Sequence, residues 1–158
     1  MSQKTKEDDV SKSKKLDSGC EIADLQVVIG VRDKEGILAV CELNKLFDHM
    51  DDIPIKRYYY IVNNSQRPSI RGGHYHPTGK VEFMTCLQGQ IWVKLKWRDE
   101  NGVLLSSKLW LDGAGPRVLL VPELVWHEVV MSESAILLVA ANCNYEPGES
   151  VEGDPPAR

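Results

Sequence analysis

The feature that most constrains the fold is a succession of short β-type runs separated by turn residues. The spacing between the turns is typical of β-sandwiches and β-barrels. The predicted strands are Leu25–Val31, Ile37–Leu43, Lys56–Asn63, Val81–Gln88, Gln90–Trp97, Val103–Leu111, Arg117–Val121, Val125–Met131 and Ala135–Ala141. Only Asn44–Met50 is predicted to be helical. Many strands, few helices and no alternation of strands with helices together predict an all-β jelly roll.

Alternation of apolar and polar residues is clearest between Ile91 and Trp97. Apolar side chains occupy every second position there, with Lys94 and Lys96 between them. Because successive side chains in a strand point to opposite faces, this run predicts a strand with one buried face. Asp99–Gly102 follows it as a predicted hairpin turn.

Length and local composition predict one folded domain with disordered termini. The chain has 158 residues, which suffices for a single core but not for two. Residues 1–20 are rich in Ser, Lys, Asp and Glu, and residues 147–158 have a similarly polar, Pro- and Gly-containing composition. We therefore expect disordered tails at 1–20 and 147–158 and a folded domain at 21–146.

Charge and hydropathy exclude two classes of partner. Apolar residues make up 42% of the chain, and 19 basic against 23 acidic residues give a net charge of −4. No basic stripe supports binding to nucleic acid. No run approaches the roughly 18 apolar residues of a membrane span, and no secretory signal is recognisable. A cytoplasmic protein without a nucleic-acid or membrane partner is the expectation.

Four residues with ligand-type side chains form the most informative motif. His74 and His76 are two apart, so in a strand they share a face, and Glu82 follows six residues later. His127 lies at the start of a later predicted strand. The spacing resembles the two motifs of the cupin fold, in which a barrel brings these positions together. The sequence therefore predicts a single cupin, or jelly-roll, barrel with these four residues in one pocket.

The role of this cluster is open on residue types alone. Three imidazoles and a carboxylate can hold Zn, Fe or Mn with an open coordination position. Neutral imidazole can equally move a proton near neutral pH. A site of that second kind needs neighbouring groups that hold an organic substrate.

The neighbours favour a substrate. The strand around Arg57 carries a cation and three tyrosines, and a buried tyrosine needs a partner for its hydroxyl. Aromatic core packing is the alternative for these tyrosines. Arg57 and Arg71 could clamp a phosphate group through paired N–H donors or could be solvated charges. Gly72 and Gly73 permit either a close backbone approach or a bend into the histidine strand.

Four longer stretches combine these residues. They are Asp33-x-x-Gly36-x-Leu38 with Pro54-x-Lys56-Arg57-x-Tyr59-Tyr60-Ile61; Arg71-Gly72-x-His74-x-His76; Glu82 with Cys86-Leu87-x-Gly89; and Val125-Trp126-His127-Glu128. Over about residues 25–145 the chain resembles the WxcM-like cupin family of dTDP-sugar 3,4-ketoisomerases.

The resemblance implies a homodimer whose first strands exchange between subunits. It also implies conversion of a dTDP-4-keto-6-deoxyhexose to its 3-keto isomer, for deoxysugars of bacterial polysaccharides, without a metal or other cofactor. Proton transfer would depend on His76, with His74 beside it as partner or oxyanion donor.

The remaining members of the site would hold the dTDP-linked keto-deoxysugar. Tyr60 and Arg71 would bind the keto sugar or its diphosphate. Arg57 and Trp126 would position the nucleotide or wall the pocket. Glu82 would orient an imidazole, and His127 would line the substrate pocket.

Two other functions stay open. One is a metal-dependent cupin enzyme that uses His74, His76, Glu82 and His127 as ligands. The other is a non-catalytic cupin that binds a sugar nucleotide, because Val62 stands where the family usually has a second tyrosine.

Overall fold

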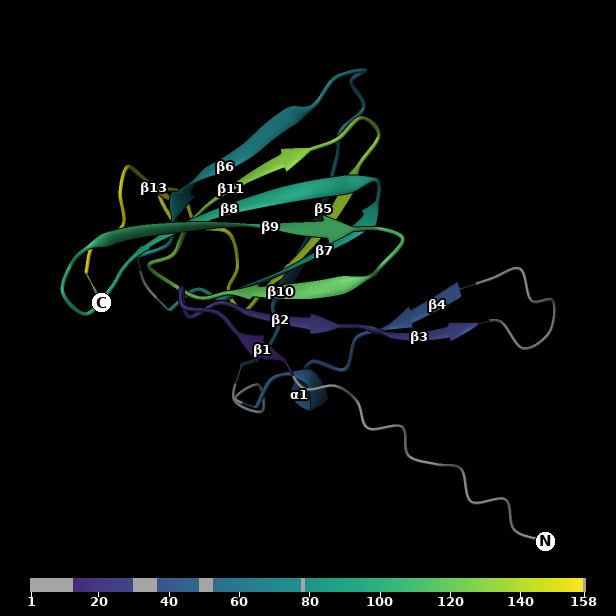
Figure 1. Ribbon diagram of the computed structural model, residues 1–158, viewed down its shortest axis with the longest axis horizontal. Coiled ribbons are helices and arrows are strands. Elements are labelled where there is room, and N and C mark those ends of the chain that lie inside the picture. Colours follow the sequence, from purple (N-terminus) through teal and green to yellow (C-terminus); the bar gives the residue numbers. More distant parts are fainter. Residues whose placement is uncertain (1–12, 30–36, 49–52, 78, 158) are drawn as a thin grey trace, which may run out of the picture.

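Two antiparallel sheets face each other and enclose the main core (Figure 1). The computed structural model describes residues 13–29, 37–48, 53–77 and 79–157. The first sheet has six strands in the order β1 (Lys14–Lys15), β2 (Glu21–Asp24), β10 (Arg117–Val121), β7 (Glu82–Gln88), β12 (Ile136–Ala141) and β5 (Arg57–Val62). The second has five strands in the order β13 (Val151–Glu152), β6 (Ser69–Tyr75), β11 (Trp126–Met131), β8 (Gln90–Arg98) and β9 (Leu104–Asp112).

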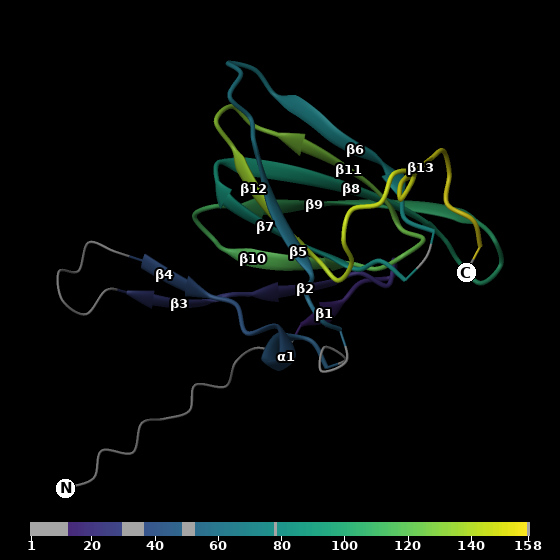
Figure 2. The same cartoon turned by 180° about the vertical axis from the view of Figure 1, so that it is seen from behind.

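A hairpin outside the two sheets completes the strand set. It pairs β3 (Gln26–Ile29) with β4 (Ile37–Val40) in a two-stranded sheet of its own. Figures 1 and 2 show it projecting beyond the barrel. The turn that joins these strands lies outside the described residues.

The alternation predicted for β8 is confirmed. Ile91, Val93 and Leu95 are completely buried, whereas Trp92 on the other face remains 38% exposed. Burial of one such aliphatic side chain contributes about 1.5–3 kcal/mol. The strand pattern thus supplies a continuous apolar surface to the main core.

The single helix of the described residues is shorter than expected. The sequence predicts a helix at Asn44–Met50, and α1 occupies Leu43–Leu46. Leu46 and Phe47 are buried in a second apolar cluster, where the Phe47 ring lies 5.7 Å from that of Phe83. This cluster lies on the outer face of β2, β10 and β7 in the six-stranded sheet. In the described part of the chain, α1 is too short to span a membrane.

Two short strands lie within the segments that the sequence predicts to be tails. Within the predicted N-terminal tail, β1 pairs with β2, and residues 1–12 lie outside the described part. Within the predicted C-terminal tail, Val151–Glu152 form β13, which pairs with β6. Backbone hydrogen bonds to the edge of a sheet need few apolar side chains, so composition alone does not reveal them.

Candidate active site

The four residues of the predicted motif meet inside the barrel. His74 on β6 is directly opposite His127 on β11, His76 follows the end of β6, and Glu82 begins β7. The ring centroids of His74 lie 4.9 Å from those of both His76 and His127, and the latter two are 5.4 Å apart. His76, His127 and Glu82 are at most 4% exposed. These four side chains are called the histidine cluster below.

A bulge in β6 aims His74 into the cluster. The pairing of β6 with β11 slips by one residue between His127 and Glu128. Gly72 and Gly73 both have positive φ angles, of 78° and 84°, which other residues adopt only at a cost. A side chain on Gly72 would place its Cβ 2.8 Å from the carbonyl oxygen of His127. The two glycines therefore permit a close backbone approach at the point where the histidine strand changes its register.

We expect Gly72→Ala to destabilise the protein more than Gly102→Ala. Both glycines have φ near 78°, but nothing lies within 4 Å of a Cβ built on Gly102. The two variants share the conformational cost of about 1–2 kcal/mol. Only Gly72→Ala adds a backbone clash, which costs about 1–3 kcal/mol more. Urea unfolding measures the difference, and equal losses of unfolding free energy would contradict it.

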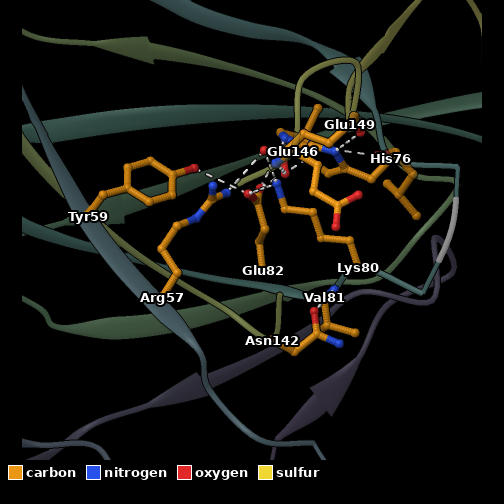
Figure 3. Close-up of polar contacts among 11 residues, drawn as sticks. Arg57, Tyr59, His76, Lys80, Val81, Glu82, Asn142, Glu146 and Glu149 are labelled. Atoms are coloured by element: carbon orange, nitrogen blue, oxygen red, sulfur yellow. Dashed lines mark hydrogen bonds and ion pairs between the residues drawn. The ribbon is translucent and has the colours of Figure 1, made fainter. Parts of the chain in front are cut away.

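Glu82 is the centre of the polar contacts in the site (Figure 3). Its Oε2 lies 3.4 Å from Nε2 of His127 and 3.6 Å from Nε2 of His76. Its Oε1 forms an ion pair with Lys80 at 3.0 Å and accepts a hydrogen bond from the Tyr59 hydroxyl at 3.2 Å. Burial alone would raise the pKa of Glu82, but its contacts with His127 and His76 and the charge of Lys80 hold it well below its usual range. Glu82 is therefore a carboxylate at neutral pH.

Backbone carbonyl groups orient two of the three imidazoles. Nδ1 of His76 lies 2.8 Å from the carbonyl oxygen of Glu149, and Nδ1 of His127 lies 3.2 Å from that of Val125. A carbonyl oxygen only accepts, so each Nδ1 carries a proton. The Nε2 atoms then face Glu82. For His74, burial and the charges of His127 and His76 lower the pKa to about 4, which leaves its imidazole neutral at pH 7.

The site also includes three residues that the sequence analysis did not assign to it. Tyr59 faces Glu82, and Lys80 is 4% exposed between Glu82 and Glu149. The spacing of Lys80 and Glu82, two apart, is a signal that could have placed them together. Glu149 has no such signal, because it reaches the cluster from 73 residues away in the sequence.

The two arginines that the sequence predicts to bind the substrate lie in different surroundings. Arg57 reaches the site, since its guanidinium donates to Glu149 at 3.1 Å and lies over the Tyr59 ring (Figure 3). Arg71 pairs with the inward-facing Val129 but is exposed and donates to the carbonyl oxygen of its neighbour in the chain.

Tyr60 and Trp126, which the sequence predicts to bind the substrate or wall its pocket, lie away from the histidine cluster. Tyr60 is 68% exposed on the outer face of β5, because strand alternation turns Tyr59 inward instead. Trp126 lies on the outer face of β11, opposite in direction to His127. The ammonium groups of Lys94 and Lys96 cover its ring at 5.7 and 4.3 Å.

The arrangement supports proton transfer on an organic molecule. Two imidazoles present Nε2 atoms beside a carboxylate, and a phenol and two cations lie next to them. A base within reach of a weakly acidic C–H group contributes about 10²–10⁴-fold to the rate of its removal. The fold and the cluster together define the class of protein: a cupin with a histidine-lined polar site.

Within that class the chain belongs to the FdtA family, described as WxcM-like, C-terminal, which matches residues 18–153. A search of curated proteins found no match. Among solved structures, a 3,4-ketoisomerase named QdtA from Thermoanaerobacterium thermosaccharolyticum, in complex with TDP-4-keto-6-deoxyglucose, is 26% identical. That match covers 87% of this chain and 89% of QdtA, with a TM-score of 0.65.

More distant structures share the fold. The TDP-quinovose 3,4-ketoisomerase WlaRB from Campylobacter jejuni is 24% identical over 85% of this chain and 92% of its own, with a TM-score of 0.66. NovW from Streptomyces spheroides, a 4-keto-6-deoxy sugar epimerase, is 14% identical over 89% of this chain and 72% of its own, with a TM-score of 0.71.

Proposed function

We propose that the protein is a nucleotide-sugar 3,4-ketoisomerase that interconverts a dTDP-4-keto-6-deoxyhexose and its 3-keto isomer. The observation that carries the proposal is the buried His76, whose Nδ1 is held by a carbonyl and whose Nε2 lacks a hydrogen-bond partner. An imidazole in this state can accept a proton. Family membership and the ketoisomerase QdtA with its bound keto sugar support the choice of substrate class.

The reaction requires one proton to leave C3 and one to arrive at C4. His76 removes the proton on C3, and the electrons of that C–H bond form the double bond of an enediolate with charge on O4. O4 gains a proton, the hydroxyl on C3 loses its own, and C4 is protonated, which leaves the ketone at C3. His74 assists by donating a proton to O4 or by accepting the proton of the hydroxyl on C3. Glu82 holds the imidazole of His76 in position.

The residues around the cluster hold the substrate in this proposal. Tyr59 takes the role expected of Tyr60, because its hydroxyl is the one that faces the cluster. Arg57 and Arg71 bind the nucleotide diphosphate through their guanidinium groups.

Incubation with dTDP-4-keto-6-deoxyglucose in D₂O tests the proposal. A 3,4-ketoisomerase yields the 3-keto isomer with deuterium at C4. A 3,5-epimerase, as some structural neighbours are, would leave the ketone at C4 and place deuterium at C3 and C5. NMR of the product distinguishes the two. Neither product nor exchange with any 4-keto nucleotide sugar would exclude the proposal, and binding without turnover would indicate a non-catalytic cupin.

A metal-dependent cupin enzyme is the second candidate. One nitrogen from each of His74, His76 and His127 lies within 4.8 Å of the others, close enough to ligate one ion, and Glu82 adds an oxygen. Such an ion would supply a Lewis acid for a carbonyl group. Elemental analysis of protein purified without chelator decides between the candidates. Near-stoichiometric metal that is lost in His127→Ala would favour the metal-dependent enzyme.

We also infer a homodimer. A two-stranded hairpin alone is marginally stable in water, and β3 and β4 pair with neither main sheet. Tyr58 and Tyr60, on the outer face of β5, are 78% and 68% exposed. A second copy that receives the hairpin and covers such surface would stabilise both. Light scattering coupled to gel filtration would give twice the chain mass, and a monomer at micromolar concentration would contradict the inference.

A further inference from the structure

The C-terminal segment from Glu146 to Glu152 contacts the histidine cluster, yet the reaction described above gives it no role. Its strand β13 pairs with β6 at His74 and Tyr75. Before β13, Glu146-Pro147-Gly148-Glu149 forms a turn in which the N–H of Glu149 donates to the carbonyl of Glu146 at 3.1 Å, with Gly148 at φ 83°. Proline followed by a glycine of positive φ is typical of a type II turn. The turn presents Glu149 to the site.

The carboxylate of Glu149 connects the two cations of the site. Its Oε1 accepts from Lys80 at 2.9 Å and from Arg57 at 3.1 Å. Lys80 in turn forms an ion pair with Glu82 at 3.0 Å, and Glu82 contacts the imidazoles of His76 and His127. A chain of charged contacts therefore runs from Glu149 through Lys80 to the cluster. Hydrogen bonds between charged groups are about twice as strong as neutral ones, so this chain restrains its members.

The backbone of the same residue acts on His76. The carbonyl oxygen of Glu149 lies 2.8 Å from Nδ1 of His76, and it accepts the proton of that nitrogen. In the neutral imidazole the proton is then absent from Nε2, the nitrogen on the side of Glu82. Functional histidines in enzyme sites often have such a second hydrogen-bond partner. It fixes the tautomer and the orientation of the imidazole ring.

We propose that Glu149 is a positioning residue of the active site. Its carboxylate holds Arg57 and Lys80 in place, and its carbonyl group keeps His76 in the tautomer with a free Nε2. The proposal rests on the proposed ketoisomerase function, since it assigns Glu149 to that reaction.

Glu149→Gln tests the carboxylate, with Glu146→Gln as the matched control. Both substitutions remove one negative charge from the same turn, but the Glu146 side chain is exposed. We expect Glu149→Gln to lower kcat about 10–100-fold, the range for partners that orient an active imidazole, with less than a roughly threefold change in KM. Glu146→Gln should keep the activity of the wild type. A kcat equal to that of Glu146→Gln would overturn the proposal. So would a lower KM at unchanged kcat, which would mean that the carboxylate merely competes with the diphosphate.

The carbonyl contact is tested without substrate. NMR of protein labelled with ¹⁵N-histidine reports which ring nitrogen carries the proton, and wild-type His76 should show the proton on Nδ1. Gly148→Ala strains the turn and should give a mixture of tautomers. Gly153→Ala, at φ 96° and with nothing within 4 Å of the added Cβ, should not. A proton on Nε2 of His76 in the wild type, or no change in Gly148→Ala, would overturn the proposal.

The two experiments separate failure of the proposal from failure of the function. An inactive wild type on every 4-keto nucleotide sugar would remove the ketoisomerase function, and Glu149 would lose its catalytic assignment with it. The tautomer of His76 would still be measurable in that case. An active wild type with an unaffected Glu149→Gln variant would remove the proposal alone.

Discussion

Replacing Glu82 by alanine is expected to lower the free energy of unfolding by about 3–5 kcal/mol, as when one partner of a buried ion pair is removed. The substitution leaves Lys80, which is 4% exposed, without one of its two carboxylate partners. It also removes the acceptor of the buried Tyr59 hydroxyl and the group that faces two imidazoles. Urea unfolding monitored by tryptophan fluorescence measures the loss.

A surface ion pair provides the control for Glu82. Glu42 contacts Lys45 at 2.7 Å on α1, with both side chains about half exposed. Because water screens such a pair, Glu42→Ala should cost less than about 1 kcal/mol. A Glu82→Ala variant as stable as Glu42→Ala would show that the buried carboxylate is not a structural centre. A double variant, Lys80→Met with Glu82→Leu, should lose less unfolding free energy than the sum of the losses in the two single variants. The reason is that no unpaired charge remains between these two positions.

His76→Asn is expected to reduce turnover by about 10²–10⁴-fold, the contribution typical of a positioned general base. Asparagine keeps a donor that can reach the carbonyl of Glu149, but it has no nitrogen that accepts a proton. Arg57 and Arg71 are unchanged, so the affinity for dTDP should stay within about threefold. Turnover is measured by NMR of the sugar products and affinity by calorimetry.

Two results would contradict this expectation. Turnover close to the wild-type value would exclude His76 as the base. Parallel loss of dTDP affinity and of the folded state would show that the substitution acts on stability instead. Metal analysis of the same variant is informative, because loss of a bound ion together with activity would favour the metal-dependent candidate.

Local patterns were enough to predict most strands, whereas the histidine cluster was predicted from residue types together with a resemblance to a known fold. Alternation from Ile91 to Trp97 depends only on the pleat of one strand, and the structure confirms it. His74, Glu82 and His127 come from three strands, but their spacing resembles a known fold that brings them together. The prediction of one pocket thus relied on the resemblance as well as on residue types.

Other features depend on contacts that no local pattern encodes. Strand alternation separates Tyr59 from Tyr58 and Tyr60, but it does not say which face meets the interior. That choice is made when β5 pairs with β12, which places Tyr59 beside the buried Val139. The structure places Tyr59 beside the histidine cluster and Tyr60 on the outer face of β5.

By itself the sequence determined the fold class, most strands and the identity of the four residues in the histidine cluster. These follow from periodicity, turn chemistry and motif spacing, which act over a few residues at a time. Only the tertiary structure decided that the polar C-terminal segment returns to the barrel and brings Glu149 to His76, Lys80 and Arg57. The physical reason is that these hydrogen bonds and ion pairs join residues about 70–90 positions apart, and their partners become apparent only once the sheets have assembled.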